Sequence, residues 1–231
     1  NMFAFVFSTP PPDSSGVAHV LEHAVLCGSR AFPVKDPFVV LLKASLQTFM
    51  NAFTFPDKTV YPAASLLEKD FFNLLAVYGD AVFFPLLREE VFLQEAHHLE
   101  KDAEQALKRV GVVYSEMKGV YSSAEAIVAD LSVRSLFPDV PYGYESGGHP
   151  KHIPSLTYER FREYHRRHYH PANCRLFLYG NIPTERTLLF LQERLLGALA
   201  SGEADAPLPA QPRWTGPRFT EAAYPVENEG R

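Results

Sequence analysis

Hydrophobic and polar positions follow two different periods along this chain, and the change of period separates predicted strands from predicted helices. Residues 3–8 and 174–179 are short, mostly apolar runs, which predicts buried strands. Across 66–84 the apolar residues instead recur every three or four positions, which predicts a helix with one side in the core. Similar patterns predict further strands over 49–55 and 59–61, and further helices over 38–47, 88–99, 112–121, 123–136, 157–169 and 184–200.

The mixture of strand and helix segments predicts an α+β architecture built from layers of sheet and helix. We expect residues 1–200, which hold all of these segments, to form one domain. The stretch 201–231 is rich in Pro and Ala and carries no period, so it is predicted to be a linker. The chain opens on a strand pattern without Met at position 1, and we therefore expect it to be a piece of a longer protein.

Composition and charge narrow the class of protein further. The chain has 231 residues, of which 46% are hydrophobic and 21% charged, with a formal net charge of −5. This mild acidity, without a basic stripe, argues against a nucleic-acid partner. No apolar run is long enough to span a bilayer, so membrane insertion is not expected. The two cysteines, Cys27 and Cys174, are too few for a disulfide framework and indicate an intracellular, reducing compartment.

The pentapeptide at 19–23, His-Val-Leu-Glu-His, contains side chains that can bind a metal ion and act as a base. If this segment is helical, His19, Glu22 and His23 share one face, because they stand at i, i+3 and i+4. Two imidazoles one turn apart can chelate a Zn²⁺ ion, and the carboxylate between them can reach the water that the ion activates. The order is the inverzincin pattern, the reverse of the usual zinc-protease helix. The surrounding residues are apolar, which argues against mere surface histidines, because a buried imidazole or carboxylate needs partners.

The start of this helix is predicted from local capping residues. Asp13, Ser14 and Ser15 offer side-chain oxygens for an N-cap, and Gly16 lies near the first turn.

Several blocks resemble the pitrilysin/insulysin group of metallopeptidases, and in particular its presequence-protease branch. They are residues 16–29, 48–54, 111–119, 146–150 and 168–173, in the family's order along nearly the whole chain. The resemblance implies a β-sheet flanked by helices. It also implies four related domains in two halves of a clamshell, of which this chain is the first, so the remaining domains of the same chain are expected partners.

A third metal ligand must come from elsewhere, since a catalytic zinc site usually has three protein ligands. Spacing alone leaves Glu95, Glu100 and Glu116 open. The resemblance assigns the role to Glu116, and Glu95 or Glu100 could instead hydrogen-bond a ligand imidazole.

The resemblance also places the segment Asn51, Ala52, Phe53 and Thr54 beside the zinc, as a strand on whose free edge an extended substrate lies. Backbone pairing would bind peptides with little dependence on their sequence. The alternative is an ordinary buried strand, favoured by Phe53 and Phe55. Both interpretations are compatible, because alternate residues of a strand face opposite ways.

Other reactive side chains are expected to be structural. His97, His98, His165, His168 and His170 have metal-like spacings, but no second metal site is predicted. The last three lie near the end of a predicted helix, where cationic side chains interact favourably with the helix C-terminus. Cys27 is interpreted as a small buried residue rather than a nucleophile, and no Ser/His/Asp motif or phosphate loop is present.

The sequence therefore predicts a zinc-dependent endopeptidase that degrades unfolded oligopeptides, with cleaved targeting peptides as one candidate class. Glu22 is the predicted base, and His19, His23 and Glu116 the predicted ligands of one Zn²⁺. The alternatives are a non-catalytic scaffold or substrate-holding member of the same family, and a zinc hydrolase with a non-peptide substrate. The expected location is the mitochondrial or plastid matrix in a eukaryote and the cytoplasm in a bacterium.

Overall fold

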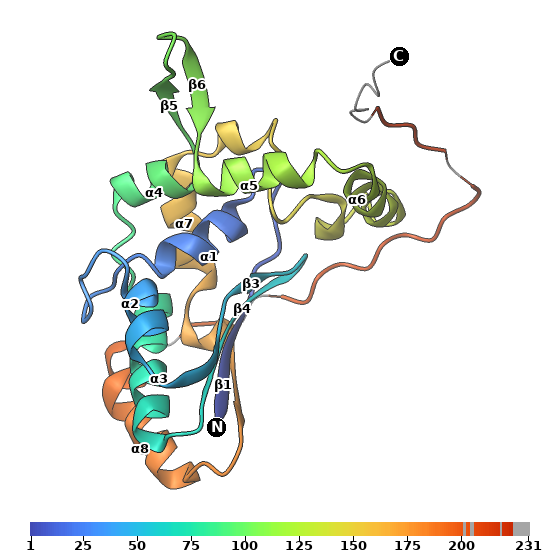
Figure 1. The fold of residues 1–231 in the computed structure, drawn as a ribbon. Coiled ribbons are helices and arrows are strands. Elements are labelled where there is room, and N and C mark those ends of the chain that lie inside the picture. Colours follow the sequence, from blue (N-terminus) through green and yellow to red (C-terminus); the bar gives the residue numbers. More distant parts are fainter. Residues whose placement is uncertain (201, 204–205, 218, 224–231) are drawn as a thin grey trace.

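The fold is built on one antiparallel sheet, and the computed structural model describes residues 1–200, 202–203, 206–217 and 219–223 (Figure 1). Strand β1 (Met2–Ser8) lies in the middle of the sheet and pairs with β4 (Lys58–Ser65) and β7 (Cys174–Tyr179). The strand order is β2-β4-β1-β7, and β3 (Phe53–Thr54) also pairs with β4, beyond the end of β2 (Gln47–Met50). β2 and β3 therefore share one edge of the sheet.

The core lies between this sheet and the helices that cover one of its faces. Phe3, Phe5 and Phe7 alternate along β1 and are fully buried, as the strand period requires. Helix α3 (Glu68–Phe83) packs on them, with the ring centroids of Phe3 and Phe71 5.7 Å apart. Helix α8 (Thr184–Arg194) lies next to α3. The predicted helix 66–84 and the strands at 3–8 and 174–179 are confirmed.

A second group of helices lies above one end of the sheet and holds α1 (Val17–Val25) in its middle (Figure 1). α1 packs against α4 (Glu89–Glu95) and α7 (Tyr158–His168), and α4 in turn contacts α5 (Val112–Val120). Helices α2 (Pro37–Ala44) and α6 (Ala124–Leu136) lie towards the periphery. Short 3₁₀ turns occur at Pro141–Gly143, Ile153–Ser155, Pro171–Asn173 and Leu196–Ala198. The expected α+β class is confirmed.

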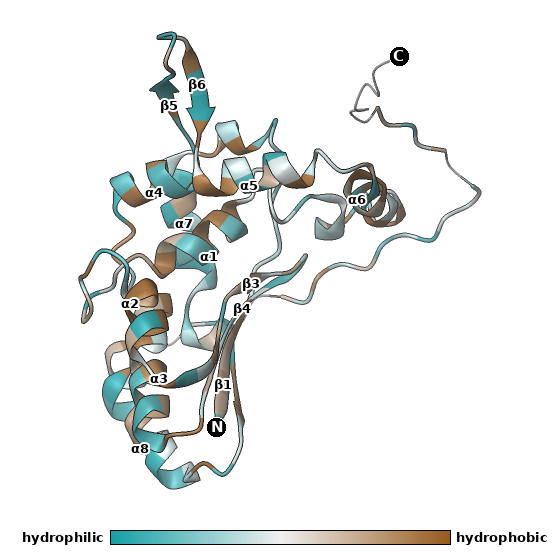
Figure 2. Ribbon diagram, viewed as in Figure 1, coloured by the Kyte–Doolittle hydropathy of each residue, from teal (hydrophilic) through white to brown (hydrophobic). Residues whose placement is uncertain are grey.

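The segment after α4 differs from the prediction. The helix expected over 88–99 ends at Glu95, because residues from His98 onwards pair with the following segment. The result is a hairpin, β5 (His98–Lys101) and β6 (Leu107–Val110), which the sequence patterns did not predict. Figure 2 shows that this hairpin is largely hydrophilic, so no apolar period marked its strands.

The boundaries around the edge strands also differ. The helix expected over 38–47 ends at Ala44, because Ser45 is extended and the chain then enters β2. The single strand expected over 49–55 is divided into β2 and β3, with Asn51 and Ala52 between them. The strand expected at 59–61 extends over the whole of β4, and the helix expected over 184–200 ends at Arg194.

Two further sequence predictions concern the ends of the fold and the membrane. In the described part of the stretch 201–231 no helix or strand is assigned, and the rest of that predicted linker lies outside the described residues. None of the described helices has the length and apolar character needed to cross a membrane.

Candidate metal centre and catalytic base

Helix α1 begins at a glycine rather than at a polar cap. Gly16 precedes the first helical residue with φ 72°, a left-handed conformation that favours glycine, and no side chain caps the helix. The predicted cap oxygen of Asp13 instead accepts a hydrogen bond from the amide of Ser15 at 2.8 Å. A Cβ on Gly16 would lie 2.7 Å from Cα of Gly148. The N-cap prediction is therefore wrong, because close contact between two backbone segments leaves room only for glycine.

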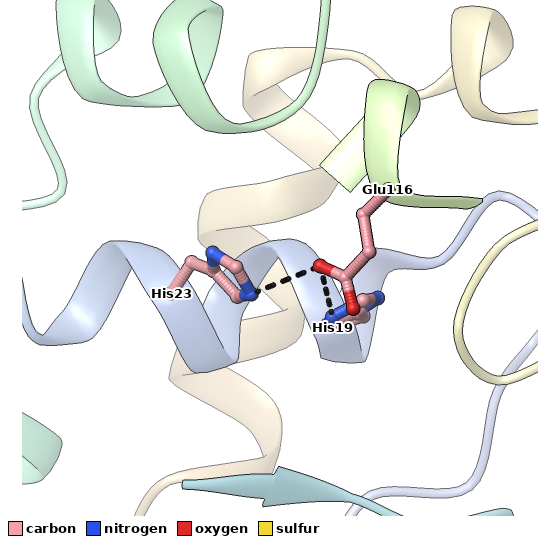
Figure 3. A group of neighbouring side chains, drawn as sticks. All are labelled: His19, His23 and Glu116. Atoms are coloured by element: carbon pink, nitrogen blue, oxygen red, sulfur yellow. Dashed lines mark ion pairs between the residues drawn. The ribbon is translucent and has the colours of Figure 1, made fainter. Parts of the chain in front are cut away.

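Helix α1 and helix α5 bring the three predicted ligands together. Nε2 of His19 lies 3.6 Å from Oε2 of Glu116, and Nε2 of His23 lies 3.8 Å from the same oxygen. The three ligand atoms all lie within 4.8 Å of one another. Figure 3 shows both imidazoles of α1 turned towards the Glu116 carboxylate, which reaches down from α5.

These separations can be compared with the needs of a tetrahedral zinc ion. Zinc–ligand distances of about 2.0–2.2 Å place neighbouring ligand atoms roughly 3.3–3.6 Å apart. The two separations between imidazole and carboxylate are close to this range, and two nitrogens with one carboxylate oxygen are a donor set that zinc accepts. The three residues would therefore fit one zinc ion after small side-chain adjustments.

Each imidazole is also held by its other nitrogen. Nδ1 of His19 lies 2.9 Å from the carbonyl oxygen of Gly147, and Nδ1 of His23 lies 3.2 Å from Oε2 of Glu95. Both partners accept a hydrogen bond, so Nδ1 of each imidazole carries the proton. Nε2 therefore keeps its lone pair and directs it towards the place where the three candidate ligand atoms come together. Glu95 is buried, and Gln94 donates to its second oxygen at 2.8 Å.

The charge of the site favours a cation. Burial lowers the pKa of His23, but the hydrogen bond that its Nδ1 donates to Glu95 and the charges of Glu22, Glu95 and Glu116 outweigh this effect, so the pKa is raised overall. Three carboxylates near two imidazoles leave an excess of negative charge, which a divalent ion would neutralise.

Glu100, the other glutamate that the spacing left open, is not part of this cluster. Its carboxylate lies 2.8 Å from Nε2 of His98 on the β5–β6 hairpin. This hydrogen bond raises the pKa of His98. Of the two alternatives to Glu116, only Glu95 contacts a candidate ligand imidazole.

The predicted base faces the sheet edge. Glu22 is 8% exposed, and its Oε2 accepts a hydrogen bond from Oγ1 of Thr54 at 2.5 Å. Of the predicted substrate strand, Phe53 and Thr54 lie in β3, whereas Asn51 and Ala52 lie in the break before it. A cavity of about 250 Å³ opens beside Glu22, lined by His23, Leu26, Phe38, Val39, Asn51 and Ala52, among others.

His165 has a structural role that differs from the one expected from the sequence. His165 is buried, donates from Nε2 to the carbonyl oxygen of Val82 at 2.9 Å and stacks on Tyr169. Burial lowers its pKa to about 4, so the expected cationic interaction of His165 with the helix C-terminus is wrong. In the part of the chain that the structure describes, the group formed by His19, His23 and Glu116 is the one cluster with metal-binding spacing.

Cys27 lies one turn after His23, with Sγ 3.5 Å from the His23 carbonyl oxygen. Burial and the nearby Glu95 raise the pKa of its thiol to about 12, so the thiolate needed for nucleophilic attack is disfavoured.

Two contacts of the site were missed by sequence reasoning. The Gly147 carbonyl holds His19 across 128 residues, and a backbone oxygen carries no residue-type signal. Thr54 was noted only for its place on the substrate strand, and its hydroxyl contact with Glu22 depends on how β3 packs on α1.

Two family models match this chain. The family model described as Insulinase (Peptidase family M16) matches residues 9–127, and the model described as Peptidase M16 inactive domain matches residues 155–227. The chain belongs to peptidase family M16. The first match contains all four residues of the candidate centre.

Among individual relatives, the presequence proteases are prominent. The chain is 52% identical to presequence protease 1, chloroplastic/mitochondrial, of Arabidopsis thaliana, over 84% of this chain and 18% of that protein. It is 47% identical to the mitochondrial presequence protease of Danio rerio, over 95% of this chain and 22% of the relative. Protein HypA of Clostridium perfringens is 51% identical over 90% of this chain and 22% of its own length. The chain thus spans about a fifth of these relatives, and the expected resemblance to the presequence-protease branch is confirmed.

Solved structures share the fold at low sequence identity. A protease from Helicobacter pylori matches with a TM-score of 0.68 and 17% identity, over 91% of this chain and 48% of that one. Pitrilysin matches with a TM-score of 0.61 and 19% identity, over 89% of this chain and 21% of that one.

Proposed function

We propose that this chain is the metal-binding domain of a zinc-dependent endopeptidase. The observation that carries the proposal is the convergence of His19, His23 and Glu116 on one point, with the Glu22 carboxylate on the same helix face. The M16 family match, which covers these four residues, supports a peptidase. A scaffold would have no need of Glu22 between the two imidazoles, and this weighs against the non-catalytic alternative.

His19, His23 and Glu116 would hold the ion, through Nε2 of each imidazole and Oε2 of the carboxylate. A zinc ion bound there supplies a Lewis acid that polarises the scissile carbonyl and lowers the pKa of water. Glu22 would accept a proton from the attacking water on its carboxylate and then donate it to the leaving amine. Gly147 and Glu95 would keep the two imidazoles in the tautomer that presents Nε2.

The substrate proposed is an unfolded oligopeptide in extended conformation. β3 and β2 form one edge of the sheet, and β3 contacts the helix that carries Glu22. A peptide that adds to this edge would bind through its backbone, with little dependence on sequence. Cleaved targeting peptides are one candidate class, supported by the similarity to presequence proteases.

The partners and the location are proposed from the same relatives. Since the chain spans about a fifth of their length, further domains of the same protein are the proposed partners that complete the substrate chamber. The relatives include chloroplastic, mitochondrial and bacterial proteins, which supports an organelle matrix in a eukaryote or the cytoplasm in a bacterium.

The experiment that tests the proposal is Glu22→Gln in the full-length protein. We expect zinc content to stay near the wild-type value, because all three ligands remain, and hydrolysis of an unstructured peptide to fall by at least about a hundredfold. Glu100→Gln is the matched control, because Glu100 is a glutamate on the distant hairpin, and it should leave both measurements unchanged. Near-normal turnover of Glu22→Gln with zinc retained would exclude Glu22 as the base. Loss of zinc would make it a ligand instead.

A further inference from the structure

The sheet edge and the catalytic helix are joined by one side-chain contact. Thr54, on β3, donates from Oγ1 to Oε2 of Glu22, on α1, at 2.5 Å. The contact connects residues 32 positions apart, and Glu22 is 8% exposed. A short hydrogen bond to a carboxylate is among the stronger ones in proteins, so it can hold the side chain in one orientation.

The backbone N–H and C=O groups of Thr54 point away from β4, towards the open edge of the sheet. The amides of Asn51 and Phe55 donate to carbonyl oxygens of β4, at Pro62 and Lys58, over 3.2 and 2.8 Å. In an antiparallel pair, residues that bond the neighbour alternate with residues whose N–H and C=O point the other way. Thr54 belongs to the second of these two sets. Its N–H and C=O groups therefore point away from β4 to the open edge of the sheet, where no described strand pairs with β3.

The side chains of β3 follow the same alternation on the two faces of the sheet. Thr54 turns its hydroxyl towards α1, whereas Phe53 and Phe55 are 38% and 41% exposed with their ring centroids 6.1 Å apart. A single residue thus presents its backbone to the open edge and its hydroxyl to the predicted base.

We propose that Thr54 is a positioning residue for Glu22, which aligns the carboxylate with a peptide held on the edge of β3. The inference rests on the proposed function, because it needs Glu22 to act as the base and the edge to bind substrate. The hydroxyl holds Oε2, which leaves Oε1 to accept the proton of the attacking water. A peptide that pairs with the backbone of Thr54 holds β3 in place. Because the Thr54 hydroxyl is bonded to Glu22, the same peptide also fixes the orientation of the Glu22 carboxylate.

Removing the hydroxyl without changing the shape of the side chain tests this role. Thr54→Val should lower kcat on an unstructured peptide by roughly ten- to a hundredfold, since a small misplacement of a catalytic group has an effect of that order. KM should change by less than about threefold, because the backbone edge remains, and zinc content should be unchanged. Thr54→Ser, which keeps a hydroxyl, should restore most of the kcat. Thr184→Val is the matched control, because Thr184 is an exposed threonine at the start of α8, which is not part of the proposed binding edge, and it should leave kcat unchanged.

The double variant with Glu22→Gln separates positioning from general damage. If Thr54 acts through Glu22, Thr54→Val should cause no further loss in the Glu22→Gln background. The proposal is overturned if Thr54→Val keeps the wild-type kcat, if Thr54→Ser is as impaired as Thr54→Val, or if the loss persists in the double variant. If Glu22→Gln alone retains full turnover, the proposed function itself fails. The single Glu22 variant therefore distinguishes that outcome from a failure of the Thr54 role.

Discussion

Glu95 holds His23 from a different helix, with its Oε2 3.2 Å from Nδ1 of the imidazole and 72 residues away along the chain. Glu95 is 5% exposed, and this buried carboxylate accepts hydrogen bonds from His23, Gln94 and the thiol of Cys27. Such outer partners orient a metal-binding imidazole and increase its basicity. The packing of α4 on α1 is therefore part of the candidate metal centre.

Glu95→Gln should weaken zinc binding by roughly ten- to a hundredfold, because the imidazole of His23 loses a charged hydrogen-bond acceptor. Competition with a chelator of known affinity measures the change. Glu90→Gln, an exposed glutamate on the same helix, is the control and should bind zinc as the wild type does. Unchanged affinity in Glu95→Gln would mean that its contact with His23 does not support the site.

Glu116→Ala should lose zinc under conditions in which the wild type retains it, since only two imidazoles would remain as ligands. In a zinc-bound crystal structure, the Glu116 carboxylate should lie about 2.0–2.2 Å from the ion. Glu125→Ala, at an exposed carboxylate on the neighbouring α6, serves as the control for zinc retention. If Glu95 or Glu100 occupies the third position in the crystal, the assignment of Glu116 is wrong.

Gly16→Ala should destabilise the protein by more than about 1 kcal/mol, because φ at Gly16 is 72° and a left-handed conformation is costly for alanine. The added Cβ would also press on Gly147 O at 2.8 Å, the carbonyl that holds His19, so zinc affinity should fall as well. Gly119→Ala is the matched control: Gly119 lies in α5, and nothing lies within 4 Å of its Cβ position. That variant should be unaffected or stabilised by up to about 1 kcal/mol. Urea unfolding of both variants is the measurement, and equal stabilities would contradict the close contact.

His165 should make the folded state less stable as the pH falls below about 6.5. Its pKa in the folded protein is about 4, below the ordinary value, so between these two pH values the unfolded chain binds a proton that the folded chain does not. The stability lost over this window is up to about 3 kcal/mol. The measurement is urea unfolding between pH 7 and 4, with a chelator present so that metal binding does not contribute. The free energy of unfolding of His165→Gln should depend less on pH than that of the wild type. His152→Gln, at an exposed histidine, is the control, and its free energy of unfolding should depend on pH as that of the wild type does. The wild-type dependence in His165→Gln would contradict the prediction.

The 231-residue chain alone should bind zinc but hydrolyse peptides poorly. All the proposed ligands lie within it, whereas catalysis also needs donors for the tetrahedral oxyanion and walls that exclude water. Loss of one oxyanion donor typically lowers the rate on the order of a hundredfold or more. Assays of the fragment beside the full-length protein, at matched zinc content, measure the difference. Comparable activity would show that one domain suffices.

The sequence by itself determined the parts of this protein that depend on local periodicity. The apolar run over residues 3–8 predicted the buried strand that became β1, and the recurrence through Phe71 and Tyr78 predicted α3. The spacing of His19, Glu22 and His23 placed the candidate ligands and base on one helix face. Such patterns can be read from sequence because strand and helix geometry fix the direction of each side chain relative to its neighbours.

Only the tertiary structure decided which distant groups meet this helix. The spacing left Glu95 and Glu100 equivalent, yet Glu95 lies against His23 whereas Glu100 pairs with His98 on a hairpin that no apolar period marked. The Gly147 carbonyl on His19 and the Thr54 hydroxyl on Glu22 depend likewise on how loops and the edge strand pack on α1. The physical reason is that these contacts are made across chain separations of 32 to 128 residues. Their geometry is fixed by packing of the whole core rather than by the backbone angles of any one segment.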